Sequence, residues 1–456
     1  MKRTLLAFLA FVAAMGVFAA PVVLKVEIPR DTPENKSRIQ AEMEKIARFE
    51  AANPGIKCVP VNFAYDNTGD FPVLQASHQA PDVLTDVWAT EAQTLVAKRW
   101  IVPLDGYIAT WDKKDWYNAA AYLPYTVGGK RYGVPDQNYI KHVIYNKALF
   151  AAAGVPTPSL TWTWDDFAKA AVKTTDKAGG VAGFAPMGKG GESGWGLSDF
   201  IYQAGGEVER MDGGKAYAAF DSAEAIAAAQ FFKDLKWKYD VIPASWANGW
   251  GDVYNVFGAK QAAIVLDADW GRNIVVNQFK MDPKNIGLAL MPKGPGARGR
   301  QAGVLGGSFD VINGLAQGKA VQDAAWKYII FEKWDDGNLK LVQSQIDDAR
   351  ANKQFRAQFQ YSPLLPGSPY VAKERALLVA NPDAAVAWGD SVFLAALPKT
   401  GHTEPPVAAQ DVYGKYLANV VQALFTDANA DPEKLMKDTA RAFQAEVLDP
   451  LNAKVR

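Results

Sequence analysis

Short apolar runs alternate with helical patterns along most of the chain. Residues 22–28 are rich in β-branched side chains and predict a first strand. Apolar residues then recur at helical spacing over 39–49, and Asn53-Pro54-Gly55 ends this pattern before a second strand begins at Ile56. Further strand-like runs occupy 83–88, 262–266, 287–291 and 304–305, and helical patterns occupy 165–173 and 320–332. This alternation predicts an α/β protein with mostly parallel sheets.

The length of the chain favours two lobes over one large sheet. Of its 456 residues, 49% are hydrophobic, and a single core rarely grows beyond about 250 to 300 residues. The periodicity does not show where the lobes divide. The glycine-rich stretch 188–196 is interpreted as one surface loop.

Charge and cysteine content exclude several classes of protein. Lysine plus arginine and aspartate plus glutamate both total 49, so no net field favours nucleic acid or an anionic membrane. The single cysteine, Cys58, excludes an intramolecular disulfide and a multi-cysteine metal site, and its apolar strand predicts a buried thiol.

The N-terminus has the pattern of a secretory signal. Lys2 and Arg3 precede an apolar run over 5–20, and Val17-Phe18-Ala19 has the small residues that a signal peptidase requires. We expect residues 1–19 to be removed, because the run is shorter than the ~20 apolar residues that a membrane span needs. No cysteine follows the run, so a lipid anchor is not expected.

Catalytic and cofactor motifs are missing from the sequence. The three histidines are too far apart for a zinc-protease helix, and no Gly-Lys pair is followed by the Ser or Thr of a phosphate-binding loop. Gly306-Gly307-Ser308-Phe309-Asp310 ends in Asp where a nucleophile elbow needs Gly. Pro432 follows Asp427–Asp431 where a calcium loop needs Gly, so these residues are better interpreted as a helix start. We expect no catalytic residue, no metal site and no cofactor.

Several segments, in order, resemble one family. Lys130-Arg131-Tyr132-Gly133-Val134-Pro135 and Ile144-Tyr145-Asn146-Lys147-Ala148-Leu149-Phe150 are its more specific motifs. Weaker matches lie at 49–57, 81–84, 100–105, 153–156, 163–167, 203–206, 257–264, 287–299 and 306–308. Together they resemble the extracellular sugar-binding proteins of ATP-driven (ABC) importers.

This resemblance implies a two-lobed periplasmic-binding-protein fold with a ligand cleft between lobes that close on a hinge. It implies an N-terminal lobe from 20–137 plus 304–357 and a C-terminal lobe from 138–303 plus 358–456, because the chain crosses between lobes more than once. The implied function is capture of a sugar, of two or more units, in the periplasm and its delivery to the permease subunits of the importer. We expect a monomer that binds no nucleic acid.

A sugar site needs carboxylates in the plane of the ring and aromatic faces above and below it. Trp270 matches a family position at which an aromatic ring meets the sugar, and Asp86 is the expected acceptor from the opposite lobe. Asp86 and Asp136 are each also compatible with a cap or a salt bridge. The complete set of candidate ligand-binding residues is Asp86, Trp88, Asp136, Trp195, Trp250, Asp269, Trp270, Ser308, Trp388 and His402.

Two other functions fit the same features. One is a binding protein for another small solute, such as a polyol phosphate, a polyamine or a peptide, although no arginine cluster suited to phosphate is found near the expected cleft. The other is a secreted glycan-active enzyme, which would also be rich in tryptophan; Asp267 and Asp269 form a carboxylate pair, but no feature places them across a sugar ring.

Overall fold

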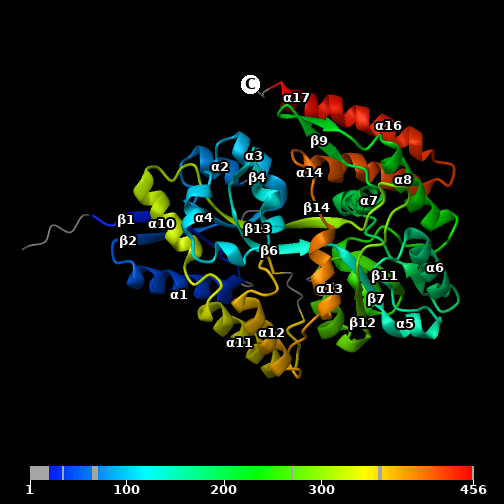
Figure 1. Ribbon diagram of the computed structural model, residues 1–456, viewed down its shortest axis with the longest axis horizontal. Coiled ribbons are helices and arrows are strands. Elements are labelled where there is room, and N and C mark those ends of the chain that lie inside the picture. The colour runs from blue at the N-terminus through cyan, green and yellow to red at the C-terminus, as the bar shows by residue number, and fades with distance from the viewer. Residues whose placement is uncertain (1–19, 33–34, 64–69, 269–270, 358–361, 454–456) are drawn as a thin grey trace, which may run out of the picture.

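Two β-sheets lie side by side, each with its own helices and apolar core (Figure 1). The computed structural model describes residues 20–32, 35–63, 70–268, 271–357 and 362–453. The first sheet contains β1 (Val22–Ile28), β2 (Ile56–Asn62), β3 (Val83–Trp88), β6 (Val134–Ile140), β13 (Gly303–Ile312) and β14 (Gly401–Thr403). The second contains β7 (His142–Asn146), β8 (Ala182–Phe184), β11 (Ala262–Asp267) and β12 (Ile286–Ala289). The two-lobed α/β prediction is therefore confirmed.

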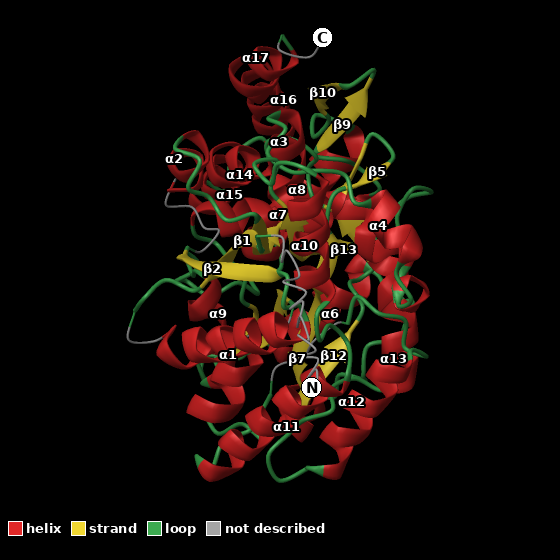
Figure 2. Cartoon of the chain, turned by 90° about the vertical axis from the view of Figure 1, so that its left-hand side faces the viewer, coloured by secondary structure: helices red, strands yellow, loops and turns green. Residues whose placement is uncertain are grey.

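The first lobe forms around the strands at the start of the chain. Leu24 and Val26 of β1 are fully buried, and Ile46 and Phe49 of α1 pack in the same cluster. The predicted strand over 22–28 and the helical pattern over 39–49 are confirmed. The helices of this lobe are α1 (Lys36–Ala52), α2 (Asp70–Ala76), α3 (Ala92–Ala97), α4 (Asp105–Thr110), α10 (Lys319–Ile330), α11 (Asp336–Ala351) and α12 (Pro369–Ala380). Figure 2, which views this lobe, shows α1, α11 and α12 below β1 and β2.

The second lobe has a larger, helix-rich core. Its helices are α5 (Lys147–Ala152), α6 (Trp164–Thr174), α7 (Gly190–Ala204), α8 (Ala223–Trp237), α9 (Trp250–Gly258), α13 (Ser391–Ala396), α14 (Ala409–Asp411), α15 (Ala418–Thr426), α16 (Pro432–Phe443) and α17 (Asp449–Asn452). Two of them begin with caps that their sequences predict. Thr163 and Asp166 form a reciprocal capping box at α6, and the Asp431 carboxylate accepts from the backbone N–H of Lys434 at α16.

The described chain also contains two hairpins and several short 3₁₀ and π-helical segments. The hairpins are formed by β4 (Thr126–Val127) with β5 (Lys130–Arg131) and by β9 (Glu209–Asp212) with β10 (Lys215–Ala218). The short segments include the 3₁₀ helix η4 (Ala119–Tyr125) and the π-helical segment η8 (Val412–Leu417). Among the described residues, no helix is both long and apolar enough to span a membrane. The predicted signal peptide, 1–19, lies outside the described residues.

The prediction of one surface loop over 188–196 is wrong, because α7 begins at Gly190. Glycine disfavours a helix locally, but tertiary packing overrides this preference. Gly194 is buried against η8, where a Cβ atom would lie only 2.4 Å from the carbonyl oxygen of Tyr413. The glycine-rich sequence therefore lets two helices approach closely.

The sheets are mixed rather than mostly parallel. β1 pairs in parallel with β2 and β3, whereas β13 runs antiparallel to both β3 and β6, and β7 runs antiparallel to β11 and β12. Parallel neighbours need a crossover within one lobe, but β6, β7 and β13 lie where the chain passes between lobes. Strands that enter a sheet from the other lobe are free to run against their neighbours.

The described part of the C-terminal stretch, 362–453, packs in both lobes, although the sequence-based division gave 358–456 whole to the second. Leu364 and Tyr370 lie in the core of the first lobe, and β14 pairs with β13 of the first sheet. Phe393 and Val412 pack in the clusters of the second lobe. Each part of this stretch buries its apolar side chains in the core that it reaches, so segments that follow one another in sequence pack in different lobes. The remaining lobe boundaries stay a prediction.

A buried ion pair lies where the chain crosses between the lobes. Lys141 links β6 to β7, and its Nζ atom lies 2.6 Å from the carboxylate of Asp199 on α7. Both side chains are almost fully buried, and the same carboxylate accepts from the backbone N–H of Val304 on β13. Burial raises the pKa of Asp199, and Lys141 lowers it in opposition. One carboxylate therefore holds both crossing segments to α7.

We predict that Lys141→Met lowers the free energy of unfolding by about 3–5 kcal/mol, because it leaves the Asp199 carboxylate buried without its cation. Chemical denaturation measures this loss. Lys169→Met is the matched control, since the Lys169–Asp165 pair is 68% exposed on both sides and should contribute at most ~1 kcal/mol. Equal losses in the two variants would contradict the role given to the buried pair.

Candidate functional site

A cleft of about 1120 Å³ opens between the two lobes. It lies at the carboxyl end of β3, where open α/β sheets expose the loops that hold ligands. Its lining from the first lobe is Arg38, Asp86, Trp88, Ala89, Thr90, Gln137, Tyr139, Gly307, Ser308 and Gln345. Its lining from the second lobe and from the loop after β14 is Lys189, Gly190, Gly191, Glu192, Trp195, Gly249, Glu404, Gln410 and Tyr413. Four of the sequence-predicted residues, Asp86, Trp88, Trp195 and Ser308, therefore meet in one cleft.

Asp86 has an unusual backbone conformation at the wall of this cleft. Its φ angle is 57°, in the left-handed region that few residues other than glycine adopt. The strand is irregular here, since the pairing of β3 with β13 shifts register between Phe309 and Val311. The Asp86 side chain is open to the cleft on one side and surrounded by protein on the others. This partial desolvation raises the pKa of Asp86, and the neighbouring Ser308 hydroxyl lowers the same pKa by a smaller amount. This conformation places the Asp86 carboxylate, a hydrogen-bond acceptor, on the wall of the cleft.

Trp195 provides an aromatic surface on the opposite wall. It lies in the first turns of α7, and its ring centroid is 3.6 Å from Nζ of Lys141. The Tyr139 ring meets it edge to face at 6.1 Å. The buried Lys141–Asp199 pair thus supports the tryptophan from behind. Trp88, at the end of β3, brings a second indole to the cleft from the first lobe.

Two glutamates of the cleft are desolvated. The hydroxyl of Tyr139 donates to Glu404 at 2.9 Å, and burial raises the pKa of Glu404 to about 7. The Glu192 carboxylate accepts from the backbone N–H of Trp250 at 2.6 Å, and burial raises its pKa too. Around neutral pH, Glu404 is therefore able to accept or to donate a hydrogen bond. Among the described residues, no group of three metal-binding side chains is assembled.

The structure places three of the other candidates in the scaffold around the cleft. Asp136 forms a salt bridge with Nζ of Lys333 at 2.5 Å, which is one of the alternatives to ligand binding that the sequence analysis gave for this residue. Trp250 donates through its ring nitrogen to Asp267 at 2.7 Å. Trp388 is 6% exposed and donates to the carbonyl of Ala357 at 2.6 Å. None of the three lines the cleft described above.

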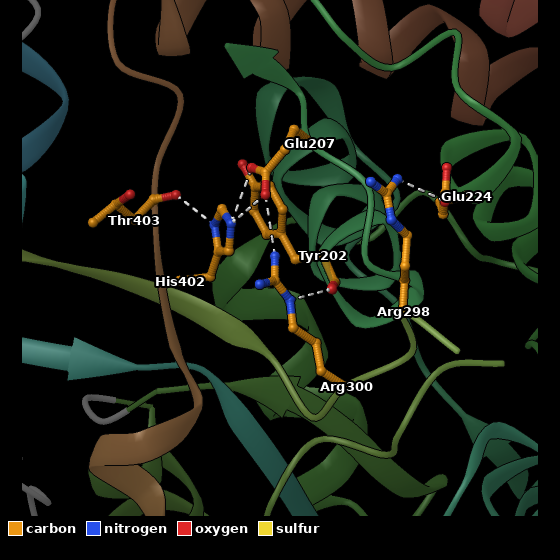
Figure 3. Close-up of polar contacts among 7 residues, drawn as sticks. All are labelled: Tyr202, Glu207, Glu224, Arg298, Arg300, His402 and Thr403. Atoms are coloured by element: carbon orange, nitrogen blue, oxygen red, sulfur yellow. Dashed lines mark hydrogen bonds and ion pairs between the residues drawn. The ribbon is translucent and has the colours of Figure 1, made fainter. Parts of the chain in front are cut away.

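His402, another candidate, joins β14 to the second lobe (Figure 3). Its Nδ1 lies 2.8 Å from the carbonyl oxygen of Thr403, and its Nε2 lies 3.0 Å from the carboxylate of Glu207. The ring stacks on Tyr202 with centroids 3.8 Å apart, and Arg300 binds the same Glu207 at 3.1 Å. Because both ring nitrogens already face oxygen atoms of the protein, His402 supports the cleft from outside its lining. Asp269 and Trp270 lie outside the described residues.

Sequence reasoning missed several lining residues. Tyr139 and Glu404 are 265 positions apart and form a pair only in the fold. Glu192 was passed over because its segment was interpreted as a loop, whereas it lies in the first turn of α7. A usable signal existed for Glu404, since it lies two residues after the candidate His402.

Comparison with known proteins gives the family. A binding protein of Brucella abortus (strain 2308) is 26% identical over 334 residues, which cover 70% of this chain and 75% of that protein. A solute-binding protein of Thermotoga lettingae, solved with α-D-tagatose, superposes with a TM-score of 0.66 at 21% identity over 93% of this chain and 99% of its own. The cyclic α-maltosyl-1,6-maltose binding protein of Arthrobacter globiformis superposes at 0.67 and 20% identity, over 94% and 100%.

These structures share the fold of the chain. The family model for bacterial extracellular solute-binding proteins matches residues 33–339, which include both crossings between the lobes and most of the cleft lining. The chain therefore belongs to the family of bacterial extracellular solute-binding proteins.

Proposed function

We propose that this protein captures a carbohydrate in the cleft between its lobes and delivers it to the permease of an ATP-driven importer. The observation that carries the proposal is the combination of indole rings and carboxylates on facing walls, with Trp88 and Asp86 on one side and Trp195 and Glu404 on the other. Aromatic faces suit the C–H surfaces of a sugar, and carboxylates accept from its hydroxyl groups. Two structurally similar proteins were solved with, or are named for, a sugar ligand.

The charges of the cleft argue against the other solute classes. Among the described residues that line the cleft, Arg38 and Lys189 are the basic ones and lie among three acidic ones, so these residues offer a phosphate group no cluster of cations. A polyamine is itself positively charged and would be repelled by both Arg38 and Lys189. A neutral, hydroxyl-rich ligand fits mixed charges, because hydroxyl groups both donate and accept. The family assignment places the protein among solute-binding proteins rather than enzymes.

Closure of the lobes would bury the ligand from both sides. The connection of β6 to β7 is the single residue Lys141, and the longer connection of β12 to β13 covers 290–302; we propose that the two lobes rotate about these connections. A cleft of about 1120 Å³ exceeds the roughly 300–1,000 Å³ of most small-ligand sites, as an open form would. The signal sequence predicted over 1–19 supports the proposal that the protein acts in the periplasm. We propose that the closed, loaded form is the one that the permease distinguishes.

We predict that at least one sugar from a panel of mono- and oligosaccharides raises the unfolding temperature of the purified protein. Ligand at 100 times its dissociation constant adds about 2.7 kcal/mol to the stability of the folded state. The same sugar should reduce the radius of gyration in solution scattering, because the lobes close on it. Stabilisation by amines or phosphates alone, with no response to any sugar, would contradict the proposal.

Trp195→Ala should weaken binding of the best sugar by about 30-fold, since truncation of an aromatic anchor costs ~2 kcal/mol or more. Calorimetry measures the affinity. Trp237→Ala is the matched control, because Trp237 lies on α8, is 43% exposed and does not line the cleft. Unfolding without ligand tests whether each variant is folded. If Trp195→Ala is folded and binds the sugar with unchanged affinity, the Trp195 indole does not contact the ligand.

Asp86→Asn should lower sugar affinity by at least about tenfold, because hydrogen bonds to a charged acceptor contribute roughly 1.5–3 kcal/mol. Asparagine keeps the size of the side chain and tolerates the left-handed backbone at this position. Stability should therefore change little, and calorimetry should isolate the loss of charge. Asp165→Asn, which alters a 68% exposed carboxylate on α6, is the control. Equal affinity in both variants would show that the Asp86 carboxylate does not contact ligand.

A further inference from the structure

A second, smaller cavity lies beside the cleft, and we propose that it binds one further unit of the same carbohydrate. This inference rests on the proposed function and names the ligand as an oligosaccharide rather than a single sugar. The cavity has a volume of about 210 Å³, which is less than the roughly 300–1,000 Å³ of sites for whole ligands. It is large enough for about seven waters. Its size suits a fragment of a ligand.

The second cavity adjoins the cleft through two amide side chains. Gln137 on β6 and Gln345 on α11 line both spaces. Gln345 is held in place because its side-chain oxygen accepts from Nε of Arg356 at 2.8 Å. We infer that a ligand longer than the cleft would extend into the second cavity past these two amides, which both donate and accept hydrogen bonds.

The walls of the second cavity carry polar groups that other parts of the described chain do not satisfy. Glu374 on α12 has a side chain only 13% exposed, and its nearest cation, Arg356, is 3.7 Å away, beyond hydrogen-bonding distance. Burial raises the pKa of Glu374. Within the described ranges, neither Glu374 nor the hydroxyl of the buried Tyr370 takes part in a hydrogen bond. Neither group is among the completely shielded polar atoms of the described residues, so both open onto the cavity, where water or a ligand can bind them.

The second cavity combines these acceptors with aromatic rings. The rings of Trp334 and Tyr370 pack edge to face with centroids 5.1 Å apart, and both line the space. This pairs an apolar surface with acceptors, as the cleft does with Trp195 and Glu404. An apolar packing void would lack the polar half of this lining.

The charges of the second cavity favour a neutral occupant. Its two acids have cations beside them, because Lys333 binds Asp136 at 2.5 Å and Arg356 lies next to Glu374. Neither a phosphate nor a polyamine finds an excess of opposite charge. The hydroxyl groups of a sugar unit satisfy acceptors and donors together, and they replace water that would otherwise fill the space.

The test measures affinity as a function of ligand length. Calorimetry is performed with ladders of one to about six units of α-1,4-glucose, β-1,4-glucose, β-1,4-xylose and β-1,4-mannose. The variant Leu341→Trp places a larger side chain at the wall of the second cavity and partly fills it. Because Leu341 is 51% exposed on α11, the larger ring fits without disturbing the core. Val379→Trp adds the same ring at a 61% exposed position of α12 that lines neither space.

In the ladder that binds, we expect one added unit to raise affinity about tenfold in the unaltered protein, as a hydrogen bond to a charged acceptor would. Leu341→Trp should remove this gain and leave the shortest binding sugar unaffected, whereas Val379→Trp should change neither. Glu374→Gln, which keeps the shape of the cavity, should reduce the same gain.

Two outcomes would overturn the proposal of a second subsite: an affinity that does not depend on ligand length, or equal losses of affinity for short and long sugars in Leu341→Trp. Either outcome would leave the proposal of carbohydrate binding in the cleft intact. If no ladder binds but another sugar of the panel does, this inference fails and the proposed function stands; if no carbohydrate binds, both fail.

Discussion

The pairing of β6 with β13 is the constraint on which the rest of the structure depends. These strands run antiparallel from Ile140 opposite Leu305 to Val134 opposite Asp310, and each leads to a crossing between the lobes. Lys141 and Val304, next to this ladder, are both held by the Asp199 carboxylate of the second lobe. The two crossings into β7 and β13 are thus held side by side where the first lobe meets the second.

Close approach of these strands requires glycine on β13. At Gly307 the φ angle is 148°, and a Cβ atom there would lie 2.1 Å from the carbonyl oxygen of Gln137. Only glycine adopts this conformation without strain and without collision. The same short stretch brings Gln137, Tyr139 and Ser308 to the floor of the cleft. The residues that join the lobes therefore also line the cleft.

Buried charge recurs along this line. Besides the Lys141–Asp199 pair, Lys333 lies between Asp136 and Asp310, and burial raises the pKa of Asp310 to about 6. Such pairs contribute little net stability compared with apolar packing, but loss of one partner is costly. They suit a segment that must keep one geometry while the lobes on either side move. The second cavity lies directly beside Asp136, so the same network would also support the subsite proposed there.

The sequence by itself determined the local elements and the class of protein. The strand over 22–28, the helix stop at Asn53-Pro54-Gly55, the capping box at Thr163 and the Asp431 cap depend on residues close together in the chain, and the structure has each of them. The ordered motifs indicated the family for the same reason, since each motif is contiguous.

Only the tertiary structure decided which polar and aromatic residues face the cleft. Trp88 and Trp195 line it, whereas Trp250 and Trp388 bind scaffold oxygens, although nothing in their neighbouring residues separates the two pairs. Gly190 to Gly196 became helical because η8 packs against α7, and Tyr139 met Glu404 across 265 positions. Periodicity and capping are properties of neighbours in sequence, whereas a cleft is built from side chains that become neighbours only when separate segments pack together.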